Sequence, residues 1–252
     1  MANMLSWVNG LQELGNGIYY IPKNTIETYS HIESLGLSTV RWKSYTPDNV
    51  LSSLDEIKRF IESNNPCLFI FDPRFPGVKK SFLFGVKDFS EVEKWIAKNK
   101  NVLTNYNYLI TTQIDNPGNG YVGSAYSDGN GRLFCETLHY PGISNQRELT
   151  QPTKDYDGYL SQLFIDLADS NEIWALSTDW LLRNDVEKII KTFINHKGYF
   201  EFVIGVQHGK LDIYIIGQES GPLFSFPSAL HLIGCNNPKY RIIGTILREG
   251  MG

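Results

Sequence analysis

Three cationic side chains, Arg74, Lys79 and Lys80, gather in the loop 73–80 between two apolar runs. The loop also contains Gly77. Arginine and lysine side chains are the donors that an anionic ligand needs, but charged loop residues are often simply solvated. The pattern leaves both interpretations open: an anion contact and a solvated basic turn.

An acidic side chain also stands in unusual surroundings. Glu201 lies between Phe200 and Phe202 in a run that is otherwise apolar. Burying a carboxylate there would be costly unless it were paired or bound to a ligand. A strand face turned toward water would explain the residue equally well.

The sequence gives little support to several well-known kinds of site. The chain has five histidines, and no two of them have metal-ligand spacing. The segment 116–131 is rich in glycine but does not match the phosphate-loop or dinucleotide patterns. No GxSxG nucleophile motif occurs. The three cysteines lack the CxxC spacing of a zinc site and are expected to be small buried residues: Cys67, Cys135 and Cys235.

Composition and charge narrow the class of protein. The 252 residues are 42% hydrophobic and 20% charged, which is ordinary globular usage and disfavours disorder. A net charge of −4 makes a nucleic-acid partner unlikely. No apolar run reaches the roughly 18 residues of a membrane span, and the N-terminus does not resemble a secretory signal. We therefore expect a cytoplasmic protein with no membrane partner.

Periodicity and turn residues predict a mixed order of helices and strands. Ser90 and Glu93 fit a capping box at the start of one helix. Helices are expected over residues 25–35, 47–63, 89–99, 159–167 and 179–194. Strands are expected over residues 67–71, 82–84, 108–114, 121–126, 133–137, 199–206, 211–216 and 240–247. This order lacks the strict alternation of a doubly wound sheet, so the fold class is α+β.

Three local patterns resemble the ATP-grasp superfamily, nearest to the nucleotide-binding region of phosphoenolpyruvate synthase and pyruvate phosphate dikinase. Residues 32–41 with the helix 47–63 resemble the opening helix, Gly-Leu turn and capped helix. Residues 69–86 resemble the strand-loop-strand that covers the phosphates. Residues 109–114, the hairpin 121–137 and the late strands resemble the adenine hinge and the magnesium-binding strand pair. The resemblance spans residues 25–220 and implies two small mixed or antiparallel sheets with flanking helices.

The resemblance also implies a binding site for ATP and Mg²⁺. By this similarity, Arg74 and one of Lys79 and Lys80 would touch phosphate oxygens, and Arg147 would assist in the same task. Gln113 would offer its amide to the edge of the adenine. Mg²⁺ neutralises charge during phosphoryl transfer, which depends on positioning more than on a protein nucleophile.

The metal site of the family would fall on the last strand pair, with Glu201 and Glu219 as ligands. Family members carry a second Glu or Gln on the partner strand and an Asn shortly after it. This chain lacks that Asn, and Glu219 comes later than the family hairpin allows. Two possibilities follow: an ATP-dependent ligase or phosphotransferase, and a degenerate member that binds ATP without turnover.

The domain organisation expected from the resemblance is one ATP-grasp-like unit over residues 1–252. Its sub-domains would cover 25–112 and 113–220, followed by a C-terminal extension at 221–252. A partner protein would supply a site for the acceptor substrate.

Two other classes of function remain alternatives. One is a non-catalytic binding module for sugar or RNA, because tyrosine rings on loops can stack on such ligands. The tyrosines in question are Tyr106, Tyr108, Tyr121 and Tyr126. The other is a structural subunit of a complex, docking through the apolar segment 223–227.

Overall fold

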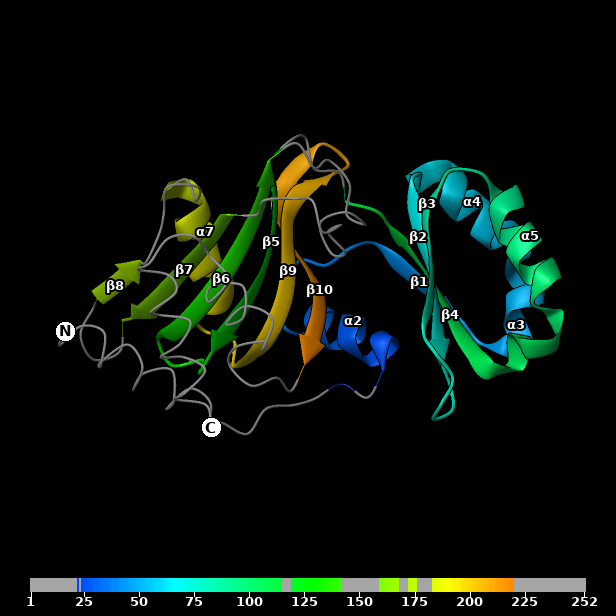
Figure 1. The fold of residues 1–252 in the computed structure, drawn as a ribbon, viewed down its shortest axis with the longest axis horizontal. Helices are drawn as coiled ribbons and strands as arrows, with labels where there is room; N and C mark the ends of the chain where they lie inside the picture. The colour runs from blue at the N-terminus through cyan, green and yellow to red at the C-terminus, as the bar shows by residue number, and fades with distance from the viewer. Residues whose placement is uncertain are drawn as a thin grey trace.

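The computed structural model describes residues 22, 24–114, 119–141, 159–167, 172–175 and 183–219. The strands in these ranges form two antiparallel sheets with flanking helices (Figure 1). The first sheet has four strands in the order β1-β4-β2-β3, and the second has six in the order β10-β9-β5-β6-β7-β8. The α+β class is confirmed.

The first sheet has an apolar core on each of its two faces. Its strands are β1 (Trp42–Tyr45), β2 (Cys67–Pro73), β3 (Ser81–Val86) and β4 (Tyr106–Thr112). Side chains alternate along β2: Phe69 and Phe71 join the core beneath the helices, whereas Leu68 and Ile70 join the core shared with the second sheet. The helices of this unit lie on the side facing away from the second sheet (Figure 1). We call the opposite side, which carries Leu68 and Ile70, the inner face.

The helix expected over 47–63 forms as three consecutive pieces. They are α3 (Pro47–Val50), the 3-10 turn η1 (Leu51–Ser53) and α4 (Leu54–Asn64). Asn49 Oδ1 accepts a hydrogen bond from the Thr46 amide at 2.7 Å, which fixes the start. Leu51 is 55% exposed, so the short turn carries its side chain away from the apolar stripe of α4.

The cap of the next helix differs from the expected one. Helix α5 (Phe89–Lys98) is followed by the 3-10 turn η2 (Lys100–Asn105). The expected capping box of Ser90 and Glu93 is wrong: Asp88 is the cap, and its Oδ1 accepts from the Ser90 amide at 2.7 Å. The helix therefore begins at Phe89, as expected, two positions before the start that a Ser90 cap would give.

The second sheet contains the clearest departure from the sequence expectation. Its strands are β5 (Asn119–Ser127), β6 (Arg132–Pro141), β7 (Tyr159–Asp166), β8 (Glu172–Ala175), β9 (Gly198–Gln207) and β10 (Lys210–Glu219). The helix expected over 159–167 is wrong, because this segment is β7, paired along β6. Ser161, Leu163 and Ile165 are buried at every second position, as in a strand.

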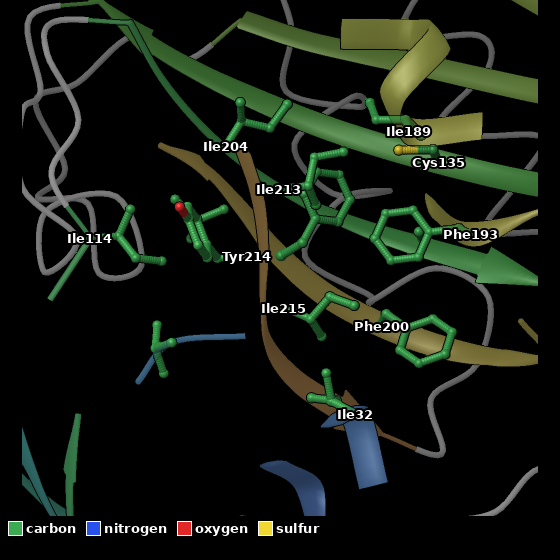
Figure 2. Close-up of a cluster of buried hydrophobic side chains, with 14 of the residues drawn as sticks. Ile32, Ile114, Cys135, Ile189, Phe193, Phe200, Ile204, Ile213, Tyr214 and Ile215 are labelled. Atoms are coloured by element: carbon green, nitrogen blue, oxygen red, sulfur yellow. The ribbon is translucent and has the colours of Figure 1, made fainter. Parts of the chain in front are cut away.

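Two helices cover one face of the second sheet. On α7 (Arg183–Phe193), the ring of Phe193 lies 5.6 Å from that of Phe200 and 5.2 Å from that of Phe202. On α2 (Thr25–Ser34), Ile32 lies beside Ile215 in the same core (Figure 2). Since side chains alternate along β9, Glu201 points to the opposite face.

The two sheets are joined by packing and by hydrogen bonds. Leu109 of the first sheet belongs to the same core as Tyr214 and Ile114, and Figure 2 shows the last two residues. The Gln207 side chain donates to the Thr112 hydroxyl. Gly36, with φ +72°, ends α2 in a left-handed conformation that favours glycine. The bridge between Thr39 and Ile215 then ties the following segment to β10.

The two sheets are built from consecutive stretches of the chain. All strands of the first sheet lie within 42–112, and those of the second lie within 119–219. Helix α2, assigned to the first sub-domain by sequence, packs against β10 of the second sheet. The division at 112/113 and the extension 221–252 stay predictions. Among the described residues, no helix combines the length and apolar composition of a membrane span.

Candidate functional site

The basic loop lies at the end of the β2–β3 hairpin, with its three cations in different situations. Arg74, Lys79 and Lys80 are all exposed. Ile70 pairs with Phe82, so Phe82 shares the inner face with Ile70. The Lys80 ammonium lies 5.6 Å from the centre of the Phe82 ring. Lys80 is therefore placed at the inner face, toward the second sheet.

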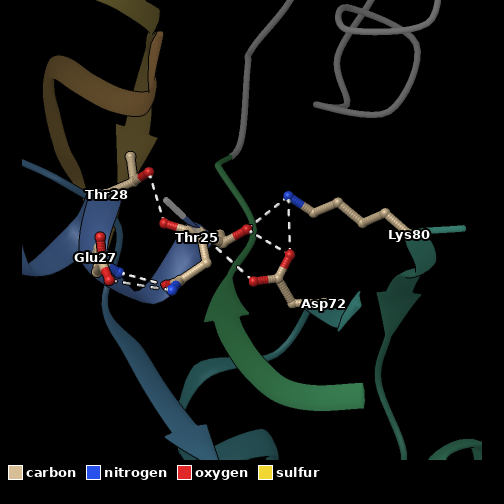
Figure 3. Close-up of polar contacts among 6 residues, drawn as sticks. Thr25, Glu27, Thr28, Asp72 and Lys80 are labelled. Atoms are coloured by element: carbon tan, nitrogen blue, oxygen red, sulfur yellow. Dashed lines mark hydrogen bonds and ion pairs between the residues drawn. The ribbon is translucent and has the colours of Figure 1, made fainter. Parts of the chain in front are cut away.

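Lys80 meets the N-terminus of α2 in a polar cluster with Asp72 and Thr25 (Figure 3). Its Nζ donates to Thr25 Oγ1 at 2.6 Å and lies 3.6 Å from Asp72 Oδ1. Asp72 is only 5% exposed. Its Oδ2 accepts from the Thr25 amide at 3.1 Å, and its Oδ1 accepts from the Thr25 hydroxyl at 2.9 Å.

This cluster is a small anion site that a carboxylate of the protein itself fills. The first amides of a helix have no partner within the helix and attract negative charge, and here one of them is bonded to Asp72. Burial raises the pKa of the neighbouring Tyr29 phenol, and the negative charge of Asp72 raises it further. Asp72 and Thr25 were missed by sequence reasoning, although the Asp72-Pro73 pair did mark the end of β2.

Arg74 is hydrogen-bonded to the 3-10 turn η2, which precedes β4. Its backbone amide donates to Asn105 O at 2.9 Å, and its Nη1 donates to Thr104 O at 3.1 Å. The guanidinium lies 5.6 Å from the centre of the exposed Phe75 ring. These contacts leave the other guanidinium nitrogens to a ligand or to solvent, and the expected phosphate role of Arg74 stays a prediction.

Gln113 links the end of β4 to β3. Its side-chain Oε1 accepts from the Gly85 amide at 2.9 Å, and its backbone amide donates to Pro66 O at 2.9 Å. Gly85 has φ +70°, so a local bend in β3 presents this amide. The side-chain carbonyl is thus used within the first sheet, which leaves the side-chain NH₂ and the backbone carbonyl for the predicted adenine contact.

Glu201, one of the two expected metal ligands, lies on β9 of the second sheet. It is half-buried and lies opposite Ser124 on β5 and opposite Gly217 on β10. Glu219 pairs with Tyr199, two positions along the strands from the pair of Glu201 and Gly217. Glu201 and Glu219 are therefore diagonal neighbours, typically about 7–8 Å apart at their Cα atoms.

The remaining expected site residue is Arg147, which lies outside the described residues. Within the part of the chain that the structure describes, no three His, Cys, Asp or Glu side chains gather in a metal-binding arrangement. If Glu201 holds Mg²⁺, water and phosphate oxygens would supply most of the other ligands, as is common for this ion.

The tyrosines behind the alternative binding module are partly core residues. Tyr108 and Tyr126 are 0% and 1% exposed, so neither offers a ring face to a sugar or a base. The Tyr108 hydroxyl donates to Leu103 O at 2.6 Å. The apolar segment 223–227 of the structural-subunit alternative lies outside the described residues.

Neither a protein-family model nor a curated protein matches this sequence. Solved structures do match. D-alanine–D-alanine ligase from Bacillus anthracis is 12% identical, over 92% of this chain and 70% of that one, with a TM-score of 0.44. N5-carboxyaminoimidazole synthetase from Staphylococcus aureus, complexed with ADP, is 13% identical, over 86% of this chain and 48% of that one, with a TM-score of 0.39. A RiPP-associated ATP-grasp ligase from Chryseobacterium gregarium, in complex with ADP and a leader and core peptide, is 11% identical. The match covers 96% of this chain and 61% of that one, with a TM-score of 0.41.

The Chryseobacterium gregarium structure is an ATP-grasp ligase, the superfamily that the sequence patterns resemble. The expected nearer resemblance to phosphoenolpyruvate synthase or pyruvate phosphate dikinase is not supported. The chain spans 70% of the first structure and about half of the second. At TM-scores below 0.5, this similarity does not determine the function of the chain.

Proposed function

We propose that this chain binds ATP between its two sheets, as an ATP-grasp protein does. The observation that carries the proposal is the contact of Lys80 with Thr25 at the N-terminus of α2, on the inner face of the first sheet. The partly exposed ammonium of Lys80 suits a phosphate, whereas the first amide of α2, on Thr25, is already bonded to Asp72. Arg74 and Lys79, from the same loop, would add charge for a polyphosphate tail.

The path of the chain supports a complete nucleotide site. Gln113 and Ile114 leave the first sheet, and β5 begins at Asn119. In the proposal the adenine lies at Gln113. From Asn119 to Ser124 the strand advances about 17 Å, which suits an extended nucleoside triphosphate. Ser124 lies opposite Glu201, so Mg²⁺ held by this carboxylate would meet the far end of the phosphate tail.

A reaction would follow from the same geometry. A ligase or phosphotransferase needs the γ-phosphate held in line with an acceptor and its charge neutralised. Arg74, Lys79, Lys80 and Mg²⁺ at Glu201 would supply that neutralisation. The acceptor site would come from a partner protein in the cytoplasm.

A thermal-shift series with the full chain tests the proposal, using ATP, GTP and ADP, each with and without Mg²⁺. A ligand at a hundredfold excess over Kd stabilises the folded state by about 2.7 kcal/mol. For a chain of this size we expect a rise in Tm of about 5–10 °C with ATP and Mg²⁺. Absence of a shift with every nucleotide would overturn the proposal.

Matched charge variants locate the ligand. Lys80→Met should reduce the shift. Lys94→Met removes the same charge from α5, on the helix side of the first sheet, and should leave the shift unchanged. An equal loss in both variants would indicate general electrostatic attraction and would count against this site.

A further inference from the structure

The carboxylate of Asp72 does not depend on Lys80 for its hydrogen bonds. Both of its oxygens accept from Thr25, one from the amide at 3.1 Å and the other from the hydroxyl at 2.9 Å. The Lys80 ammonium is 3.6 Å from Oδ1, beyond hydrogen-bond length. If Lys80 moved away, Asp72 would keep two donors at the positive end of α2, so no buried charge would lose all its partners.

Lys80, in contrast, is placed to exchange partners. Its side chain is 38% exposed, whereas that of Asp72 is 7% exposed. The ammonium makes one hydrogen bond in the cluster, to Thr25 Oγ1, and a lysine has three donors on a flexible stem. A phosphate approaching from the inner face can therefore bind the Lys80 ammonium while Asp72 and Thr25 keep their hydrogen bonds to each other.

From this asymmetry we infer that Asp72 is an internal counter-anion that sets the affinity of the loop 73–80 for polyphosphate. Its fixed negative charge neutralises part of Lys80, so an anionic ligand must compete with Asp72 for that ammonium. A weakly charged anion gains little from the exchange, whereas a triphosphate tail gains enough to draw Lys80 away. The inference rests on the proposed function and adds an affinity-determining residue to its site.

The direction of the effect separates this role from a structural one. If Asp72 only braced α2 and the hairpin, removing its charge would lower stability and would weaken or not alter ligand binding. If it competes for Lys80, removing its charge tightens polyphosphate binding even though stability falls. Asp72→Asn suits the test, because the amide keeps the size of the side chain and one acceptor for Thr25.

The experiment is a double-mutant cycle in ligand affinity with the full chain. Calorimetry would measure the Kd of inorganic tripolyphosphate, and of ATP with Mg²⁺, for wild type, Asp72→Asn, Lys80→Met and the double variant. Lys79→Met, with and without Asp72→Asn, is the matched control from the same loop. Circular dichroism at the titration temperature would verify that each variant is folded.

We expect Asp72→Asn to tighten tripolyphosphate binding about tenfold, the size of one charge interaction at a few ångströms in water. In the Lys80→Met background, the gain in affinity caused by Asp72→Asn should fall below about threefold. In the Lys79→Met background, the full gain should persist. Unchanged or weaker binding by Asp72→Asn would overturn the inference, as would an equal gain in the Lys79→Met and Lys80→Met backgrounds.

The two proposals fail in different ways. If wild type binds ATP but Asp72→Asn binds no tighter, the counter-anion is wrong and the ATP site stands. If Asp72→Asn binds tripolyphosphate more tightly than wild type but no variant binds ATP, the ATP site is wrong and the counter-anion stands. If nothing binds either probe, both are overturned.

Discussion

Glu201 on β9 lies directly opposite Gly217 on β10, and its carboxylate fills the space that a side chain on residue 217 would need. A Cβ built on Gly217 would lie 2.7 Å from Glu201 Oε2. The ATP-grasp resemblance expects an acidic or amide side chain on the partner strand. The residue directly opposite Glu201 is instead a glycine, and Glu219 follows two residues later along β10.

A methyl group at residue 217 should therefore displace the Glu201 carboxylate. We expect Gly217→Ala to lower Mg²⁺-dependent ATP affinity about tenfold, the loss of one ion contact worth about 1.4 kcal/mol. Stability should change by less than about 1 kcal/mol, because the clashing atom is the end of a flexible side chain. Calorimetric titration of ATP with and without Mg²⁺ would measure the first, and urea unfolding the second.

Glu201→Gln is the matched comparison, since it removes the charge and keeps the shape. It should reproduce the loss seen with Gly217→Ala in the presence of Mg²⁺ and have little effect without the metal. ATP affinity that is the same in all three proteins would show that Glu201 holds no metal.

The cap of α5 gives a second prediction. The Ser90 amide donates to Asp88, which lowers the pKa of that carboxyl from its ordinary value of 3.8. A lowered pKa in the folded state stabilises it above pH 4, and this stabilisation is lost as the pH falls through the folded-state pKa. Asp88→Ala should lower Tm by a few degrees at pH 7, and the difference from wild type should shrink near pH 3.

Ser90→Ala is the control for the cap, because the capping box expected from sequence would make Ser90 the important residue. We expect its Tm to stay close to that of wild type. A larger loss with Ser90→Ala than with Asp88→Ala would restore the capping box. Differential scanning calorimetry at pH 7 and pH 3 would decide between the two.

Local signals predicted most elements of the first sheet, and the same kind of signal misled at β7. The apolar run 67–71 ends in Asp72-Pro73, which marks a strand without knowledge of its neighbours. Across β7 and the residue that follows it, the apolar residues Leu160, Leu163, Phe164 and Leu167 have helical spacing, yet β7 pairs with β6. Sheet pairing, a tertiary interaction, overrides the local period.

The candidate site was predictable in its residue types but not in its contacts. Sequence reasoning found Lys80 in a basic loop. It did not find Thr25, 55 positions away from Lys80, or the hydrogen bonds of Thr25 to Asp72 over 47 positions. No local pattern contains such pairs, because the meeting of α2 with the β2–β3 hairpin is set by the packing of both sheets around one core.

The core beneath α5 gives a third prediction. Phe71 is fully buried, and its ring stacks on that of Trp95 with 3.4 Å between centroids. Phe71→Ala should lower the free energy of unfolding by about 3–5 kcal/mol, because it leaves a cavity. Phe82→Ala, on the adjacent strand with a side chain 40% exposed, should cost less than about 1 kcal/mol. Similar losses in urea unfolding would contradict this division of faces.

Two buried tyrosines of the first sheet give a fourth prediction, about alkaline pH. Burial raises the pKa of Tyr45 to about 12, with a further contribution from Glu56. Burial raises the pKa of Tyr108 to about 12 as well, assisted by Tyr106. The unfolded value is near 10, so the folded state keeps both protons longer. Stability is therefore full below pH 10 and is lost as the pH rises toward 12.

The two tyrosines should respond differently to phenylalanine, because only one hydroxyl is bonded. Tyr108 donates to Leu103 O, so Tyr108→Phe should cost about 1 kcal/mol at pH 7. The buried Tyr45 hydroxyl has no partner in the described structure, so Tyr45→Phe should be neutral or stabilising. Each variant should also remove about 2–3 kcal/mol of the stability loss between pH 10 and pH 12. Urea unfolding at pH 7, 10 and 11.5 would measure both effects, and a destabilising Tyr45→Phe at pH 7 would mean that its hydroxyl is bonded.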